Sequence, residues 1–181
     1  MPRKERALGH RARRRRDSEM PAVAVIRIRG HAKIQHQAVE TMDQLKLNRV
    51  NHCVVLPQNA TTKGMLQRVK DYVTWGELGH ETLARLLFQK GEVTGGGRLT
   101  DAYVKENSKF TSILSLAKAV EKGEASLSEV KGLKPVLRLP PPRKGYENTK
   151  LSYVDRGSLG NRGVEIEKLI DRMLAKPKEA K

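Results

Sequence analysis

Cysteine and long apolar runs are scarce in this chain, and their scarcity excludes several classes of protein. Cys53 is the single cysteine among 181 residues, so neither an intramolecular disulfide nor a zinc site built on several thiolates can form. No apolar stretch reaches the roughly 18 to 20 residues that a membrane span needs. The N-terminal arginines are not followed by the apolar segment of a secretory signal. We therefore expect a soluble, cytoplasmic protein without membrane partners.

The chain also lacks the usual catalytic patterns. Its histidines form no i, i+4 pair around a carboxylate, and no serine lies in a Gly-x-Ser-x-Gly setting. Gly95-Gly96-Gly97-Arg98 does not have the Gly-x-x-x-x-Gly-Lys-Ser/Thr spacing of a phosphate-binding loop, and we interpret it as a flexible basic turn. We therefore predict a protein that is not an enzyme and has no cofactor, metal site or small-molecule substrate.

Acidic and aromatic residues are few as well. The chain has 20 Asp and Glu against 36 Lys and Arg, which gives a formal net charge of +16 at pH 7. Such a charge repels itself in a compact chain unless a polyanion neutralises it, so nucleic acid is the first partner to consider. Aromatic residues make up only 4%, which argues against a base-stacking platform like that of an RNA-recognition motif.

The pattern of apolar residues predicts an α+β fold with a compact β-α-β-α-β core over residues 21–78. Residues 22–29 predict a strand that begins apolar on both faces and ends with alternating isoleucine and arginine. The run that Pro57 ends predicts a second strand, and residues 73–78 predict a third. Residues 37–45 and 62–72 have the apolar spacing of helices, and the side chains of Asn59, Thr61 and Thr62 are expected to cap the second helix. We expect both helices on one face of a small sheet.

The regions on either side of this core have a different character. Residues 1–20 contain four consecutive arginines and almost no apolar residues, which predicts a basic tail that is disordered or ordered only by RNA. A nuclear localisation signal is the alternative interpretation of those arginines. Residues 79–181 predict a helical and extended C-terminal extension packed on the core, with a capping box from Ser126 to Glu129.

Two polar segments of the extension have more than one interpretation. Residues 157–163 have the Gly-x-x-Gly spacing of a KH loop, but they follow an extended segment rather than a helix. We interpret them as a tight turn that brings backbone N–H groups and Arg162 near a phosphate. Residues 143–150 either lie along RNA or form a surface loop over the core.

Several segments in combination resemble the universal large-subunit ribosomal protein family numbered thirty. They are AVIRIRG with its basic loop, LKLNRVN leading into VVLP, TTKGMLQRVKDYVTWG, HETLARLLFQKGEV and GSLGNRGVEIEKLIDRML. The resemblance covers about residues 22–175, and the last two segments match the archaeal and eukaryotic branch. The short N-terminal tail favours the archaeal type. The resemblance implies a ferredoxin-like core of three mainly antiparallel strands with two helices on one face, embedded in large-subunit ribosomal RNA.

We therefore expect a structural constituent of the large ribosomal subunit that binds and stabilises ribosomal RNA in translation. The expected partners are large-subunit ribosomal RNA and neighbouring ribosomal proteins, with the small 5S-type ribosomal RNA as a further candidate. A free-standing RNA- or DNA-binding architectural or chaperone protein is the alternative. The predicted RNA contacts are Arg13, Arg14, Arg15, Arg16, Arg29, His31, Lys33, Arg49, Asn51, His52, Thr62, Lys63, Lys70, Arg98, Lys144, Arg156, Asn161 and Arg162.

Overall fold

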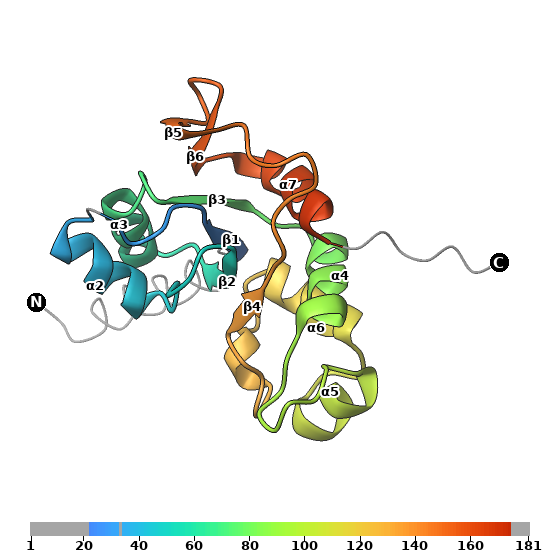
Figure 1. Cartoon of the computed structure of the whole chain (residues 1–181). Coiled ribbons are helices and arrows are strands. Elements are labelled where there is room, and N and C mark those ends of the chain that lie inside the picture. Colours follow the sequence, from blue (N-terminus) through green and yellow to red (C-terminus); the bar gives the residue numbers. More distant parts are fainter. Residues whose placement is uncertain (1–21, 33, 175–181) are drawn as a thin grey trace, which may run out of the picture.

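The computed structural model describes residues 22–32 and 34–174, and a six-stranded sheet runs through the centre of this part of the chain (Figure 1). The strands are β1 (Ala22–Arg27), β2 (His52–Pro57), β3 (Val73–Glu77), β4 (Val136–Arg138), β5 (Asn148–Ser152) and β6 (Gly157–Asn161), in the spatial order β4-β2-β1-β3-β6-β5. The predicted basic tail, with Arg13, Arg14, Arg15 and Arg16, lies outside the described residues, as does Lys33.

The predicted β-α-β-α-β core is confirmed, with β1 at its centre. Both β2 and β3 pair with β1 in antiparallel fashion, so that Val25 lies opposite Val54 on one side and Trp75 on the other. The helices α2 (His36–Gln44) and α3 (Ala60–Arg68) make the two connections. Every residue of β1 is buried. This explains why the strand is apolar on both faces, because both faces of the sheet are covered.

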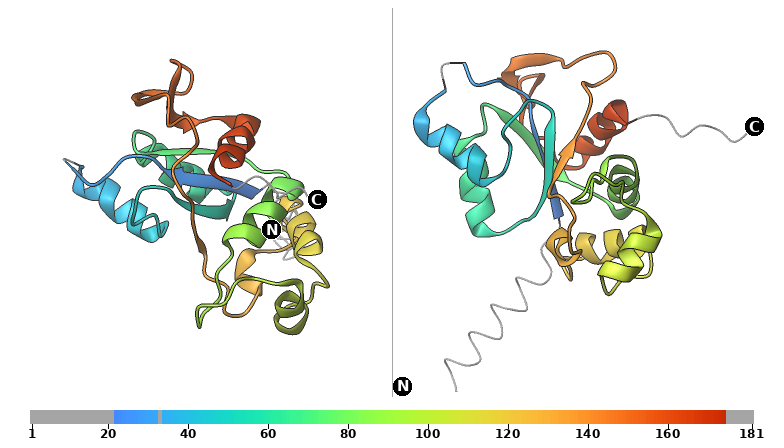
Figure 2. Two further views of the ribbon diagram at one scale, coloured as in Figure 1. Left: turned by 45° about the vertical axis from the view of Figure 1, so that its right-hand side comes forward. Right: turned by 60° about the horizontal axis from the view of Figure 1, so that its bottom comes forward.

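Two separate apolar clusters form the core, one on each face of the sheet. Val23 and Val25 pack with Met42 and Leu66 from α2 and α3. Ala24 and the other alternate residues of β1 pack in the second cluster, which the extension supplies. Figures 1 and 2 show α2 and α3 on one side and the helices of the extension on the other. These helices are α4 (His80–Lys90), α5 (Asp101–Asn107), α6 (Ile113–Glu121) and α7 (Ile166–Met173), with short 3-10 turns η1 (Leu127–Glu129) and η2 (Gly163–Glu165).

The sheet is larger than the three strands that we predicted, because the extension adds strands at both of its edges. Cys53 of β2 pairs with Leu137 of β4 in antiparallel fashion, and Thr74 of β3 pairs with Gly160 of β6 in parallel fashion. These strands satisfy backbone groups that would otherwise be exposed along the outer edges of β2 and β3. The tight turn that we expected at residues 157–163 is accordingly the strand β6 followed by η2.

Helix caps follow the sequence prediction in one place and depart from it in another. The capping box is present, since the backbone N–H of Ser126 donates to Glu129 Oε1 over 3.1 Å. Asn59 is the N-cap residue of α3, but its side chain makes no capping hydrogen bond. The prediction for α3 was wrong on this point, since Thr62 lies within the helix and is buried.

The buried thiol of Cys53 allows a direct test of whether the sheet opens without unfolding of the whole protein. Its thiol is fully buried in β2, and burial raises its pKa to about 12. Because the thiolate is the reactive form, we predict that iodoacetamide at pH 8 labels Cys53 only as fast as the protein unfolds. Labelling followed by mass spectrometry over a urea series should track the unfolding transition seen by circular dichroism. Labelling in native buffer at the rate of an exposed thiol would contradict the prediction.

Candidate nucleic-acid interface

Four strand ends meet at one end of the sheet, and the basic residues gather there. The backbone N–H of Asn51 donates to the carbonyl of Arg27 over 2.8 Å, and that of Leu139 donates to the carbonyl of Asn51 over 3.1 Å. The N–H groups of Ile28 and Arg29 both donate to the carbonyl of Tyr72. The end of β1 is thereby tied to the starts of β2 and β3 and to the end of β4. We call this region the basic strand end and define it by Arg27, Arg29, His31, Arg49, Asn51, His52, Lys70 and Arg138.

Polar contacts hold the loops of the basic strand end together. His31 Nε2 lies 2.9 Å from the carbonyl oxygen of Asn48, which joins the loop after β1 to the loop before β2. Arg29 donates to the carbonyl of Asp71 over 3.2 Å, and its guanidinium lies 5.3 Å from the centre of the Tyr72 ring. The structure therefore brings together five residues that the sequence predicted as separate contacts: Arg29, His31, Arg49, Asn51 and His52.

Asn51 links this region to the extension. Its side-chain Oδ1 accepts a 2.6 Å hydrogen bond from the hydroxyl of Tyr146. Burial raises the pKa of Tyr146 to about 12, so the phenol keeps its proton at neutral pH and remains a donor. The polar segment 143–150 is thereby anchored at one point beside the strand end.

Three of the predicted contacts have a left-handed backbone that residues other than glycine rarely adopt. Asn51 has φ of 65°, Lys144 of 65° and Arg156 of 59°. Each such residue costs on the order of 1 to 3 kcal/mol, and residues of this kind cluster at functional sites. Lys144 and Arg156 are also exposed.

Arg27 differs sharply from its neighbour Arg29, although both end the same strand. The Arg27 side chain is 0% exposed. Its Nε donates to the carbonyl of Arg29 over 2.8 Å and its Nη1 to that of Leu47 over 2.6 Å. Burial lowers the pKa of Arg27, and the charge of Asp43 partly offsets this. The alternation of isoleucine and arginine at the end of the strand gives no sign of this difference, yet the structure places the Arg27 guanidinium under the loop before β2.

Arg162 is also turned inward. It is 7% exposed, its Nε donates to Thr74 Oγ1 over 3.1 Å, and its Nη2 donates to the carbonyl of Ser158 over 3.1 Å. Its guanidinium lies 4.5 Å from the centre of the Tyr153 ring, and burial lowers its pKa. These contacts hold β6 against β3, which is a structural task.

The other predicted contacts lie away from the basic strand end. Thr62 and Lys63 belong to the first turn of α3, which starts beyond the opposite end of β2. Arg98 is exposed in the turn that follows α4, where its backbone bridges to Glu92. Asn161 is exposed at the end of β6, where its side chain accepts a hydrogen bond from the N–H of Gly163.

Sequence reasoning missed Arg138. It is exposed, ends β4 and lies directly opposite His52 in the sheet. The alternation from Val136 to Arg138 could have indicated a strand with one polar face, but its position beside His52 depends on a pairing between segments more than 80 residues apart.

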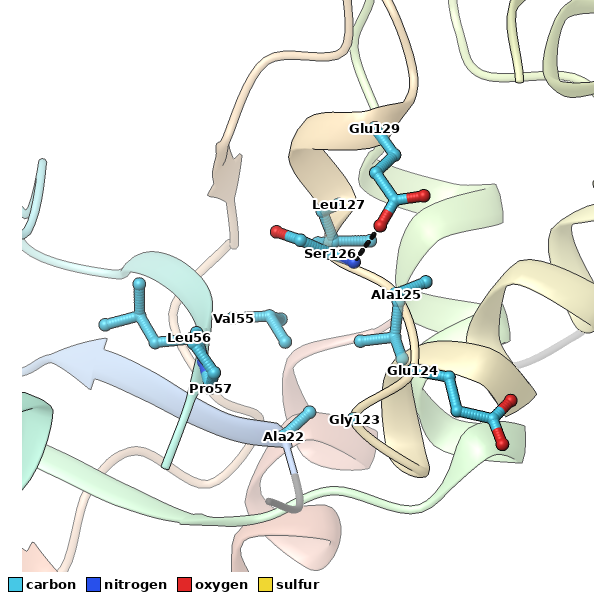
Figure 3. A pocket seen from close by; sticks show the side chains of 11 residues that line it. Ala22, Val55, Leu56, Pro57, Gly123, Glu124, Ala125, Ser126, Leu127 and Glu129 are labelled. Atoms are coloured by element: carbon cyan, nitrogen blue, oxygen red, sulfur yellow. Dashed lines mark hydrogen bonds between the residues drawn. The ribbon is translucent and has the colours of Figure 1, made fainter. Parts of the chain in front are cut away.

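A cleft of about 230 Å³ lies between the far end of β2 and the segment around η1 (Figure 3). Val55, Leu56 and Leu127 contribute apolar side chains to its lining. Its carboxylates do not converge on the cleft, because Glu129 is held by the N–H of Ser126 and Glu124 points away from β2 (Figure 3). The cleft therefore has a lining that is part apolar and part polar, without converging carboxylates.

Fold and surface together define the class: a small, strongly basic α+β protein that presents cations and amides where the strands of a mixed sheet end. No helix within residues 22–32 and 34–174 is long and apolar enough to cross a membrane. A family model described as "Ribosomal protein L30p/L7e" matches residues 23–73, which run from β1 to the first residue of β3.

Curated relatives extend this match over most of the chain. The large ribosomal subunit protein uL30 of Methanosphaera stadtmanae is 48% identical over 151 residues, which are 83% of this chain and 99% of that protein. The proteins of the same name from Archaeoglobus fulgidus and Methanocella arvoryzae are 49% and 45% identical over 150 residues, 83% of this chain and 98% of each relative. The chain therefore belongs to the uL30 family, as the sequence motifs predicted, and is of the archaeal type.

Proposed function

We infer that the protein is a structural constituent of the large subunit of the cytoplasmic ribosome, where it binds and stabilises ribosomal RNA in translation. Its uL30 relatives, which it matches over nearly their whole length, are large-subunit proteins by name. The structural observation that carries the mechanism is the gathering of cations and amides at the basic strand end. Ribosomal RNA and neighbouring ribosomal proteins are accordingly its partners.

We propose that the basic strand end is the primary RNA contact. Arg49 and Lys70 are exposed there and can neutralise phosphates, while the loops that carry His31 and Asn51 match the shape of the RNA. Lys144 and Arg156 extend the contact along the polar segments of the extension. Thr62 and Arg162 are left out of this interface because their side chains are buried, and Arg27, which is buried as well, contributes its charge rather than a direct contact.

The remaining parts of the chain have supporting tasks in this proposal. Residues 21–78 carry most of the primary contact, and the extension 79–181 adds Arg138 to it and braces it by covering the second face of the sheet. The basic tail 1–20 and the exposed Lys63 and Arg98 neutralise further phosphates. The small 5S-type ribosomal RNA is a second RNA that the surfaces away from the basic strand end could meet.

Sedimentation tests the function as a whole. A native lysate is separated on a sucrose gradient at low magnesium and moderately high salt, and the protein is quantified in each fraction. We expect one copy per large subunit and almost none with the small subunit. A free-standing nucleic-acid-binding protein would instead wash into the light fractions or follow free RNA or DNA, and that result would overturn the proposal.

A further inference from the structure

Three side chains lie in one row across three neighbouring strands at the basic strand end. Ile26 pairs with Cys53 in the antiparallel β1–β2 pair, so the next residue, Arg27, lies beside His52. His52 in turn lies directly opposite Arg138 of β4. Residues that are directly opposite each other project to the same face of a sheet, and here this is the face covered by α2 and α3, because Val54 packs in that cluster.

This row is strongly positive. Arg27, Arg49 and Arg138 all act on His52, and together with burial, which is the largest cause, they lower its pKa. The charged groups around the imidazole are thus Arg27 from β1, Arg49 from the loop before β2 and Arg138 from β4. The carboxylate of Asp43 on α2 acts on Arg27. The fold therefore has a local excess of positive charge here. Like charges side by side on a sheet are destabilising, and an anion bound to this row would relieve their repulsion.

Two polar atoms of the same row are buried without a hydrogen-bond partner among the described residues. They are Nη2 of Arg27 and Nδ1 of His52. A buried polar atom without a partner loses its hydrogen bonds to water and gains none in the fold, so it destabilises the folded state. Arg27 is otherwise fixed by its two carbonyl contacts, so its charge stays in place beneath the exposed Arg49 and Arg138.

We propose that Arg49, His52 and Arg138, above the fixed charge of Arg27, form a seat for one phosphate group of the RNA, and that His52 takes up a proton from solvent when the phosphate binds. The proposal rests on the RNA-binding function and specifies one subsite of it. A guanidinium presents a planar fork of donors that suits phosphate oxygens. The negative charge of the phosphate also attracts the imidazolium form of His52 and offsets its repulsion by the three arginines, so the protonated imidazole becomes the stable form.

The seat exists because of the extension. Arg138 belongs to β4, which joins the sheet beside β2, whereas the other three residues belong to the core. The added strand therefore supplies the third cation of the subsite as well as covering the edge of β2.

Binding of deproteinised large-subunit ribosomal RNA at pH 8 and pH 6, at one salt concentration, tests the proposal on the full chain. We expect the wild type to bind up to about tenfold more tightly at pH 6, which is within the limit for uptake of one proton. His52→Gln should lose this difference. Arg138→Gln should bind more weakly at both pH values and show a smaller difference, because His52 is then easier to protonate before RNA binds. Lys118→Gln, an exposed residue of α6, is the charge-matched control and should behave as the wild type.

An NMR titration of the imidazole ring adds a readout without RNA. Inorganic phosphate should raise the pH midpoint of His52 relative to chloride at equal ionic strength, and Arg138→Gln should reduce the shift. Equal midpoints in the two salts, or equal pH ratios for wild type and His52→Gln, would overturn the phosphate seat. Failure of the wild type to bind the RNA at either pH would instead count against the function itself.

Discussion

Replacing Gly76 with alanine is expected to lower the free energy of unfolding by about 3 kcal/mol, at the upper end of the usual cost of overpacking. Gly76 lies in β3 at the point where η2 and α7 cross the strand. A Cβ placed on Gly76 would overlap the carbonyl oxygen of Gly163 and lie 2.9 Å from Cβ of Ile166. Neither neighbour is the flexible end of a side chain, so the extension itself has to move away from the sheet.

A matched substitution at Gly64 separates this clash from a general effect of alanine. Gly64 lies inside α3, and a Cβ there would meet nothing within 4 Å. Alanine should therefore stabilise the protein by about 0.5 to 1 kcal/mol through helix propensity. Urea unfolding followed by circular dichroism measures both variants. A midpoint for Gly76→Ala equal to that of the wild type would mean that α7 does not pack tightly on β3.

The second large effect is expected in RNA binding, when Arg49 and Lys70 are both replaced by glutamine. Both side chains are exposed at the basic strand end, and each is expected to neutralise one phosphate. Loss of two such contacts should reduce the slope of log K against log[salt] by about 1 to 2 units. Filter binding of large-subunit ribosomal RNA between about 50 and 200 mM salt gives the slope directly.

The control for this variant removes the same charge elsewhere. Lys118 and Lys122 are exposed on α6 and at its C-terminal cap, and their replacement by glutamine should leave the slope within about 0.5 unit of the wild type. An equal loss of slope in the two double variants would mean that net charge, and not the basic strand end, sets the affinity. Lys63→Gln then reports on the opposite end of the sheet, where α3 begins.

The core was predictable because its pattern is local. β1 and β2 carry apolar runs, and β3 has Val73 and Trp75 at alternate positions, so that each can be identified without reference to the rest of the chain. The strands of the extension could not be recognised in this way. β5 has the sequence NTKLS and is largely exposed, and β6 is a strand because Gly160 lies opposite Thr74, 86 residues earlier. Such strands depend on their partners rather than on their own residues.

In the candidate interface, too, the features with a local sequence pattern were predictable and those that depend on distant contacts were not. The motif LKLNRVN and the histidine that follows it placed Arg49, Asn51 and His52 at a strand start, and the ends of neighbouring antiparallel strands lie side by side. The difference between Arg27 and Arg29 was not predictable, because it depends on the carbonyl of Leu47, which tertiary packing brings over the strand end. The inward position of Arg162, which we had predicted to lie near a phosphate, was not predictable for the same reason. Its hydrogen bond to Thr74 depends on tertiary packing, and the Gly-rich segment itself does not indicate it.

The covering of β1 by the extension has a consequence for the order of events during synthesis. Ala22, Ala24 and Ile26 pack against residues that follow Leu78, with α7 among the last to be made. At about 5 to 20 residues per second, translation of residues 79–174 takes on the order of 5 to 20 s. Throughout that interval the newly made strands have one apolar face without its helices. The nascent chain is therefore the stage at which this protein is most exposed to aggregation and most in need of a chaperone.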